Sequence, residues 1–225
     1  ENIDALEFTI DSETEEEAKV VREILEYPTP CAVNATLHPF QVSGYNWLRT
    51  LDHRKRSGLL ADEMGLGKTL QVISYLAAMK EEERVAPSLV VLPKTLIQNW
   101  FDEVNRFCPT LVVAQYSGGH VPDVSLFEGV DLVLTTYDTL RINQVDLARI
   151  DWNVVVCDEA QAIKNPTTGR TTAVKGLKSR MRIAMTGTPV ENGLSELWSI
   201  MDWVQPGLLK SRIDFRTQYE RPIVA

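Results

Sequence analysis

The stretch Gly58-Leu59-Leu60-Ala61-Asp62-Glu63-Met64-Gly65-Leu66-Gly67-Lys68-Thr69 decides the fold. It begins as a short apolar run, passes through a loop punctuated by glycines, and ends where an amphipathic helical pattern starts. Glycines let backbone N–H groups turn inward around phosphate oxygens, and the start of a helix adds the positive end of its dipole. The stretch therefore predicts a strand, a phosphate-binding loop and a helix in direct succession.

Two side chains of this loop have defined chemical roles. Lys68 would reach the β- and γ-phosphates of a nucleotide as a point charge, and the Thr69 hydroxyl would ligate Mg²⁺. Asp62 stands where the general phosphate-loop pattern has its first glycine, so the match to that pattern is incomplete. The loop residues that we expect to bind the nucleotide are Asp62, Met64, Gly65, Leu66, Gly67, Lys68 and Thr69.

A second motif supports the first. The apolar run Val154-Val155-Val156-Cys157 ends in two adjacent carboxylates, Asp158 and Glu159. Carboxylates at the end of a buried strand are costly unless a cation sits beside them. Asp158 can hold Mg²⁺ through its water shell, and Glu159 can activate the attacking water as general base. We therefore expect Lys68, Asp158 and Glu159 to be the catalytic residues.

Short apolar runs alternate with helical patterns along most of the chain. The predicted strands are 58–61, 88–92, 111–116, 131–135, 153–157 and 182–185, and the predicted helices are 68–80, 96–107 and 193–204. Continuous apolar runs suit parallel strands that are covered on both faces. The alternation predicts an α/β fold, a doubly wound and mostly parallel sheet flanked by helices, with the ligand site at the carboxyl ends of the strands.

The amino-terminal segment differs from the rest of the chain. Residues 1–30 carry ten acids and two bases, whereas the remainder holds 21 of each. Ser12 and Glu15 form a capping-box pattern that predicts a helix at about 12–26, and Pro28 and Pro30 then mark a linker. We expect an acidic appendage at 1–35 and one nucleotide-binding domain at 36–225.

Composition excludes several classes. No run approaches the roughly 18 apolar residues that a membrane span needs, and the three cysteines and three histidines lack metal-ligand spacing. We therefore expect a cytoplasmic protein without disulfides or zinc and without a membrane partner. Between Glu159 and Glu191 there is no acid but there are six bases, which indicates either a solvated face or a surface that contacts phosphate.

The motifs together resemble the Swi/Snf-type remodelling ATPases of helicase superfamily two. The resemblance rests on 62–69 with its aspartate, on Asp158-Glu159-Ala160-Gln161, and on Thr186-Gly187-Thr188-Pro189. It continues in order through 37–41, 92–100, 134–137 and 197–201, over nearly all of 37–222, in a style closer to bacterial and archaeal members. It implies a RecA-like lobe that binds ATP and Mg²⁺, acts on double-stranded DNA, and remodels proteins bound to that DNA.

The resemblance also implies roles for individual residues. Gln41 would read adenine, because its amide can donate and accept at once. Lys94, Thr95, Asn99, Thr135 and Thr136 fall where the family touches one DNA strand. Gln161, Thr186, Gly187 and Thr188 would couple the nucleotide site to DNA, although a helix cap by Thr188 ahead of Pro189 is also compatible with the sequence. Trp100 and Tyr137 are expected to be structural.

The family has two RecA-like lobes, and the later motifs of the second lobe are absent from this sequence. We therefore expect the first lobe of a larger polypeptide, nearly inactive by itself, at the nucleoid in a bacterium or archaeon and in the nucleus in a eukaryote. One alternative is a nucleotide-sensing scaffold without turnover, which the Asp158-Glu159 pair disfavours. Another is a strand-separating helicase of superfamily two, which Gln161 disfavours because those groups have Asp or His there.

Overall fold

The computed structural model describes residues 23–84, 86–119, 127–190 and 193–220. Its centre is a sheet of six parallel strands in the order β1-β6-β5-β2-β4-β3. The strands are β1 (Gly58–Leu60), β2 (Ser88–Leu92), β3 (Val113–Gln115), β4 (Leu132–Thr136), β5 (Asp151–Cys157) and β6 (Lys178–Met185). All six predicted strands are present, and only β6 begins markedly earlier than its apolar run indicates.

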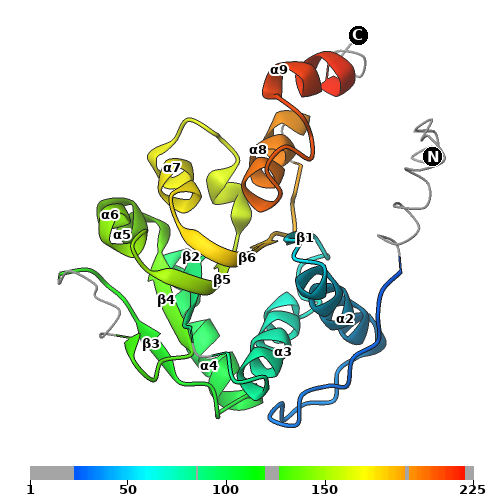
Figure 1. The fold of residues 1–225 in the computed structure, drawn as a ribbon, viewed down its shortest axis with the longest axis vertical. Coiled ribbons are helices and arrows are strands. Elements are labelled where there is room, and N and C mark those ends of the chain that lie inside the picture. The colour runs from blue at the N-terminus through cyan, green and yellow to red at the C-terminus, as the bar shows by residue number, and fades with distance from the viewer. Residues whose placement is uncertain (1–22, 85, 120–126, 191–192, 221–225) are drawn as a thin grey trace.

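Helices cover both faces of the sheet (Figure 1). On one face lie α2 (Pro39–His53), α3 (Lys68–Glu81) and α4 (Ile97–Phe107), and on the other α5 (Tyr137–Ile142), α6 (Gln144–Leu147), α7 (Gly169–Lys175) and α8 (Leu194–Val204). Successive side chains of β2 enter the two cores in turn, Val90 on the α3 side and Val91 on the α5 side. The doubly wound α/β prediction is confirmed.

Short helical segments also follow two of the strands and the last long helix. Single 3₁₀ turns, η1 (Lys94–Leu96) and η3 (Ala160–Ile163), are separated by one residue from the end of β2 and by two residues from the end of β5. After α8, the short helix α9 (Arg212–Phe215) and one π-helical turn, η4 (Arg216–Glu220), extend away from the sheet (Figure 1). Within the described ranges, no helix is long and apolar enough to cross a membrane.

The segment ahead of α2 corrects part of the prediction for the amino terminus. Most of the helix expected at 12–26 lies outside the described residues, but residues 23–26 are described and are not helical. The N–H of Leu25 donates to Thr50 Oγ1 at 2.9 Å, and that of Tyr27 donates to Asn46 Oδ1 at 3.1 Å. Because side chains of α2 take these N–H groups, the segment runs extended along α2 and the prediction is wrong for these four residues.

The basic stretch between 164 and 182 is engaged mainly inside the molecule. Four of its six bases form ion pairs, namely Lys164 with Glu196, Arg170 with Asp138, Lys175 with Asp202 and Arg180 with Asp52. Arg182 donates to the carbonyl oxygen of Trp203 at 2.9 Å, whereas Lys178 is exposed at the start of β6. These bases therefore tie helices to one another and to the sheet, which neither of the two sequence interpretations anticipates.

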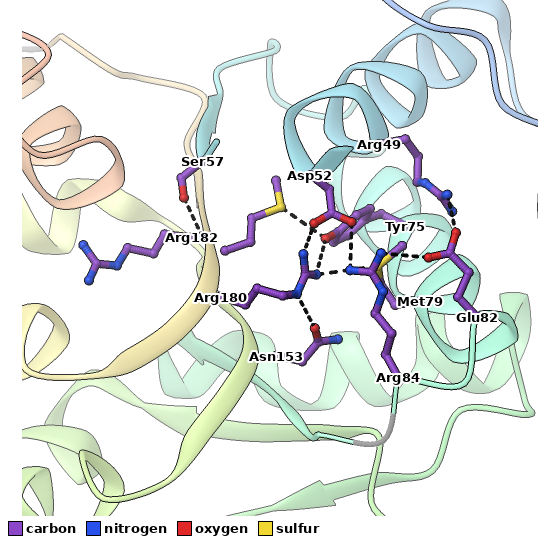
Figure 2. Close-up of polar contacts among 11 residues, drawn as sticks. Arg49, Asp52, Ser57, Tyr75, Met79, Glu82, Arg84, Asn153, Arg180 and Arg182 are labelled. Carbon is purple, nitrogen blue, oxygen red and sulfur yellow. Dashed lines mark hydrogen bonds and ion pairs between the residues drawn. The ribbon is translucent and has the colours of Figure 1, made fainter. Parts of the chain in front are cut away.

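The most buried of these ion pairs is centred on Asp52, at the end of α2 (Figure 2). Its carboxylate, on a side chain only 3% exposed, pairs with Arg180 of β6 and with Arg84, which lies 3.0 Å away. Arg180 also donates to Asn153 at 2.9 Å and to the Tyr75 hydroxyl at 3.2 Å, and burial lowers the pKa of its guanidinium. This cluster joins α2, the end of α3 and the amino ends of β5 and β6.

Asp52→Ala is expected to lower the free energy of unfolding by about 2–3 kcal/mol. Removing one partner of a buried ion pair costs roughly 3–5 kcal/mol, and the partial exposure of both arginines reduces that figure. Urea unfolding measures the loss. Asp146→Ala, which removes an ion pair to the exposed side chain of Arg149, is the control, with an expected change of about 0.5 kcal/mol or less. Equal losses in the two variants would contradict the stabilising role of the Asp52 cluster.

Candidate active site

The phosphate loop connects β1 to α3 at the carboxyl edge of the sheet. Gly65 and Gly67 have φ of 84° and 71°, in the left-handed region that side chains with a Cβ rarely adopt. A Cβ added at Gly67 would also lie 2.5 Å from Gln41 Nε2. The backbone conformation therefore favours glycine at this position, and the Gln41 amide would have to move to make room for a Cβ.

Lys68, the first residue of α3, folds its side chain back over the loop. Its ammonium donates to the carbonyl oxygens of Asp62 at 2.7 Å and Glu63 at 2.9 Å. Two neutral acceptors fix the position of the ammonium without neutralising its charge, and a third N–H donor remains. Lys68 also lowers the pKa of Asp158, so its charge acts on the carboxylate at the end of β5.

Asp62, the residue that departs from the general loop pattern, has a structural partner. Its Oδ2 accepts a hydrogen bond from Gln71 Nε2 at 3.0 Å, and Gln71 is fully buried in α3. Gln71 in turn lies against Gly44 of α2, where an added Cβ would meet its Oε1 at 1.8 Å. The aspartate therefore ties the start of the loop to the first turn of α3.

Gln41, expected to read adenine, lies beside the loop. Its Oε1 accepts from the backbone N–H of His38 at 3.0 Å, and its Nε2 donates to the carbonyl oxygen of Leu66 at 3.3 Å. These two bonds fix the side-chain amide between the start of α2 and the phosphate loop. One N–H of the amide and one lone pair of its oxygen remain for a ligand.

Three hydrogen bonds fix Asp158 at the end of β5. Its Oδ2 accepts from Trp100 Nε1 at 2.8 Å, its Oδ1 accepts from the N–H of Glu159 at 2.9 Å, and its carbonyl oxygen accepts from the Tyr137 hydroxyl at 2.8 Å. Burial raises the pKa of its carboxyl, and the bond from Trp100 and the charge of Lys68 oppose that rise. The carboxylate therefore has a fixed orientation and a large desolvation cost, which a cation would offset.

A series of hydrogen bonds joins Glu159 to the turn that follows β6. Gln161 Nε2 donates to Glu159 Oε2 at 2.8 Å, Thr186 Oγ1 donates to Gln161 Oε1 at 3.0 Å, and the N–H of Thr188 donates to Thr186 Oγ1 at 3.0 Å. Glu159 has φ 50° and ψ 56°, a left-handed conformation that costs energy for a residue with a Cβ. Such strain is typical of functional sites.

The order of the strands explains why this turn lies where it does. Because β6 lies between β1 and β5, the turn at its end separates the phosphate loop from Asp158 and Glu159. A Cβ added at Gly187 would lie 2.6 Å from Met64 Cγ, so the turn contacts the loop directly. The idea that Thr188 caps a helix is wrong, since the next helix, α8, begins at Leu194 after Gly193.

The residues expected at DNA differ in whether their side chains are exposed or hydrogen-bonded within the protein. Lys94, Thr95 and Asn99 are exposed on η1 and the start of α4. Thr136 caps α5 by accepting from the N–H of Thr139 at 3.0 Å. Thr135 is fully buried and its hydroxyl donates to the carbonyl oxygen of Tyr116 at 2.9 Å, so its side chain does not reach the surface. A DNA contact at Thr135 stays a prediction.

Sequence reasoning missed three contributors to the site, namely Gln71, Trp100 and Tyr137. Trp100 and Tyr137 are as deeply buried as expected, but both donate to Asp158. The signal in the sequence was a polar atom on each buried ring, since a buried Trp N–H or Tyr O–H usually finds a partner. The identity of the partner depends on which strands are neighbours, and the sequence alone does not give that order.

A parallel sheet covered on both faces, with a glycine loop and lysine at one strand end and an Asp-Glu pair two strands away, defines a nucleotide-binding lobe of the RecA-like type. The family model described as the SNF2-related domain matches residues 40–225. The chain belongs to this family.

Two curated proteins are similar to most of this chain. The chain is 38% identical over 220 residues to the TATA-binding protein-associated factor mot1 of Aspergillus fumigatus, covering 91% of this chain and 12% of that protein. It is 36% identical over 194 residues to the ISWI chromatin-remodeling complex ATPase ISW1 of Saccharomyces cerevisiae, covering 83% of this chain and 17% of that protein. The chain therefore spans less than a fifth of these curated relatives.

A solved structure gives the same result at the level of the fold. The Sulfolobus solfataricus SWI2/SNF2 ATPase core in complex with dsDNA matches with a TM-score of 0.78 and 42% sequence identity. The match covers 90% of this chain and 42% of that one. At this level of identity the likeness extends to the sequence as well as to the fold.

Proposed function

We propose that residues 36–225 are the ATP-binding first motor lobe of a DNA-dependent ATPase of Swi/Snf type, preceded by an acidic appendage at 1–35. The intact enzyme would hydrolyse ATP to ADP and phosphate while it moves along duplex DNA and displaces or remodels proteins bound there. One observation carries the proposal: the hydrogen-bonded series from Glu159 through Gln161 to Thr186, beside the loop that positions Lys68.

The phosphates of ATP would bind to the N–H groups of the loop and to the ammonium of Lys68, which is already fixed above the loop by two carbonyl oxygens. The Thr69 hydroxyl and the Asp158 carboxylate supply hard oxygen atoms of the kind that Mg²⁺ prefers. The buried carboxylate of Asp158 fits a cation for a second reason, the desolvation that raises its pKa. Mg²⁺ bound there would neutralise charge on the β- and γ-phosphates.

Glu159 would accept a proton from the attacking water. Its Oε2 is fixed by Gln161, and Gln161 is fixed by the Thr186 hydroxyl, so a movement of the turn after β6 would reorient the general base. Gly187 allows this turn to pack against Met64 of the phosphate loop. Gln161, Thr186, Gly187 and Thr188 would therefore couple nucleotide hydrolysis to events outside the nucleotide site. Gln41 would read adenine with the N–H and lone pair that its own contacts leave available.

Duplex DNA is the proposed partner, and phosphate groups are the proposed contact. The exposed side chains of Lys94, Thr95 and Asn99 provide one cation, one hydroxyl and one amide, a set that binds phosphate without reading sequence. Likeness to a solved core described as in complex with dsDNA supports this choice. We also propose a second RecA-like lobe in the same polypeptide as a partner, and a location at the nucleoid or in the nucleus, where DNA is.

Turnover in the presence of duplex DNA tests the proposal. The intact ATPase is expected to hydrolyse ATP faster when duplex DNA is added. This chain by itself is expected to bind nucleotide weakly and to turn over negligibly, because arginines of a second lobe contribute about 10³–10⁵ in rate in related phosphoryl transfer. Strong DNA-stimulated turnover by the 225 residues alone would contradict the two-lobe proposal.

Two further outcomes separate the alternatives. Nucleotide binding without turnover under any DNA condition would indicate a sensing scaffold. Strand displacement from a forked duplex would indicate a strand-separating helicase, whereas a duplex translocase is expected to leave the two strands paired.

A further inference from the structure

Two buried aromatic side chains converge on Asp158. Trp100 Nε1 donates to its carboxylate at 2.8 Å, and the Tyr137 hydroxyl donates to its carbonyl oxygen at 2.8 Å. Trp100 is fully buried and Tyr137 is 3% exposed. A hydrogen bond to a carboxylate is stronger than one between neutral groups, so the indole of Trp100, together with the N–H of Glu159, fixes how this carboxylate is oriented.

Trp100 comes from the segment that the proposed function places at DNA, and Tyr137 comes from the segment of Thr136, which the family resemblance places there. Trp100 directly follows Asn99 on α4, one turn beyond the exposed Lys94 and Thr95. Tyr137 directly follows Thr136, the residue that caps α5. In each segment, the residue expected at DNA (Asn99 or Thr136) is followed directly by a buried aromatic residue. Both aromatic side chains donate a hydrogen bond to Asp158.

The sheet makes this convergence possible. Strand β2 lies between β5 and β4, with Val91 opposite Cys157 and Leu92 opposite Thr136. The N–H of Asp158 donates to the carbonyl oxygen of Val91 at 2.9 Å, so the backbone of Asp158 is also tied to the strand that leads into η1 and α4. Since protein interiors are close-packed, a small shift of α4 or α5 at the surface passes to Asp158 rather than being absorbed.

We propose that Trp100 and Tyr137 are positioning residues for Asp158. When DNA binds at Lys94, Thr95, Asn99 and Thr136, the two aromatic side chains would reorient the carboxylate of Asp158, which would hold Mg²⁺. This inference rests on the proposed function. It adds a route that is distinct from the series Thr186-Gln161-Glu159, because it acts on the metal-binding carboxylate rather than on the general base. DNA would then control both carboxylates of the site from different strand ends.

A purely structural role predicts something different. If the two hydrogen bonds only satisfy buried polar groups, their loss should lower stability and leave the response to DNA unchanged. The decisive quantity is therefore the stimulation factor, the ratio of kcat with saturating duplex DNA to kcat without DNA. It is measured in the intact ATPase.

Trp100→Phe removes the indole N–H and keeps a buried aromatic ring. We expect the stimulation factor to fall about tenfold, the size expected for loss of a hydrogen bond to a charged group. Trp203→Phe is the matched control, because Trp203 is also fully buried and its Nε1 has no hydrogen-bond partner among the described residues. The two variants share the cost of a smaller ring, and only the first loses a contact with Asp158.

Tyr137→Phe tests the second hydrogen bond. It also keeps the inference testable if Trp100→Phe does not fold. Its expected effect is a fall of about threefold to tenfold in the stimulation factor, since the lost bond is to a neutral carbonyl oxygen. Tyr45→Phe is its control, because the Tyr45 hydroxyl donates to the carbonyl oxygen of Pro28 at 2.9 Å, away from the site.

A binding measurement gives a readout other than turnover. Isothermal titration of ADP at a series of Mg²⁺ concentrations, with and without duplex DNA, gives the Mg²⁺ concentration for half-maximal ADP affinity. DNA is expected to shift this concentration in the wild type and in Trp203→Phe, and to leave it unchanged in Trp100→Phe.

Each outcome decides the inference. A stimulation factor and a Mg²⁺ shift that stay at wild-type values in Trp100→Phe and Tyr137→Phe would overturn it while leaving the proposed function intact. Equal losses in Trp203→Phe and Tyr45→Phe would overturn it too, since they would indicate a general packing defect. A wild-type enzyme without DNA-stimulated turnover would overturn the proposed function, and this inference with it.

Discussion

Lys68→Ala in the intact ATPase is expected to lower kcat/KM for ATP by about 10³-fold or more. The substitution removes the ammonium that the structure fixes above the phosphate loop, 2.7 Å and 2.9 Å from two loop carbonyl oxygens. Groups aimed at developing charge in a site that excludes water contribute about 10²–10³ each, and in the proposed function Lys68 would face the phosphates in both the ground and the transition state. Steady-state hydrolysis with saturating duplex DNA measures the loss.

Lys80→Ala is the control for this variant. Lys80 lies at the other end of the same helix, where it pairs with Asp131 at 2.6 Å and donates to the carbonyl oxygen of Thr110. Its loss removes the same kind of side chain without touching the loop, so we expect kcat/KM within about twofold of wild type. A Lys68→Ala enzyme with nearly normal kcat/KM would mean that this ammonium does not contact the transferred phosphate.

Glu159→Gln is expected to separate ATP binding from hydrolysis. General-base catalysis contributes about 10²–10⁴, so kcat should fall by that factor when the carboxylate becomes an amide. The amide oxygen can still accept from Gln161, which keeps the series to Thr186 in place. ATP affinity should therefore stay close to the wild-type value. Single-turnover hydrolysis and equilibrium binding of a fluorescent ATP analogue measure the two quantities.

Glu81→Gln provides the comparison for this charge change. Glu81 ends α3 and accepts from the N–H of Ala32 at 3.0 Å, a bond that an amide oxygen can also accept. We expect normal turnover in this variant. Unaltered hydrolysis by Glu159→Gln would refute the role of Glu159 as base, and loss of ATP affinity without loss of kcat would give this residue a binding role instead.

Much of the sheet could be predicted because its strands are continuous apolar runs. Strand β2 is buried along its full length, and a short apolar run of that kind is typical of a central parallel strand. Strand β6 begins four residues before its apolar run, because Arg180 within it is held by Asp52 and Asn153 from other elements. No local pattern signals such distant partners. The same reason applies to residues 23–26, where the N–H of Leu25 bonds to a side chain of α2 rather than within a helix of its own.

Only the local features of the candidate site could be predicted from the sequence. The phosphate loop could be predicted from its residues, because glycines with positive φ and a lysine at a helix start are local features. The coupling roles of Gln161 and Thr186 followed only from the family resemblance, and the structure joins the two side chains by a hydrogen bond of 3.0 Å. The bonds from Trp100 and Tyr137 to Asp158 depend on β2 lying between β5 and β4, which is a property of the whole sheet.

Equilibrium binding of ATP in the presence of Mg²⁺, compared between the wild type and Lys68→Ala by isothermal titration, tests the central claim most directly. If the ammonium above the glycine loop neutralises a triphosphate beside the carboxylate of Asp158, the variant should lose at least about tenfold in affinity, which is about 1.4 kcal/mol or more. Equal affinity in the two proteins, with both folded, would place the nucleotide elsewhere on the molecule.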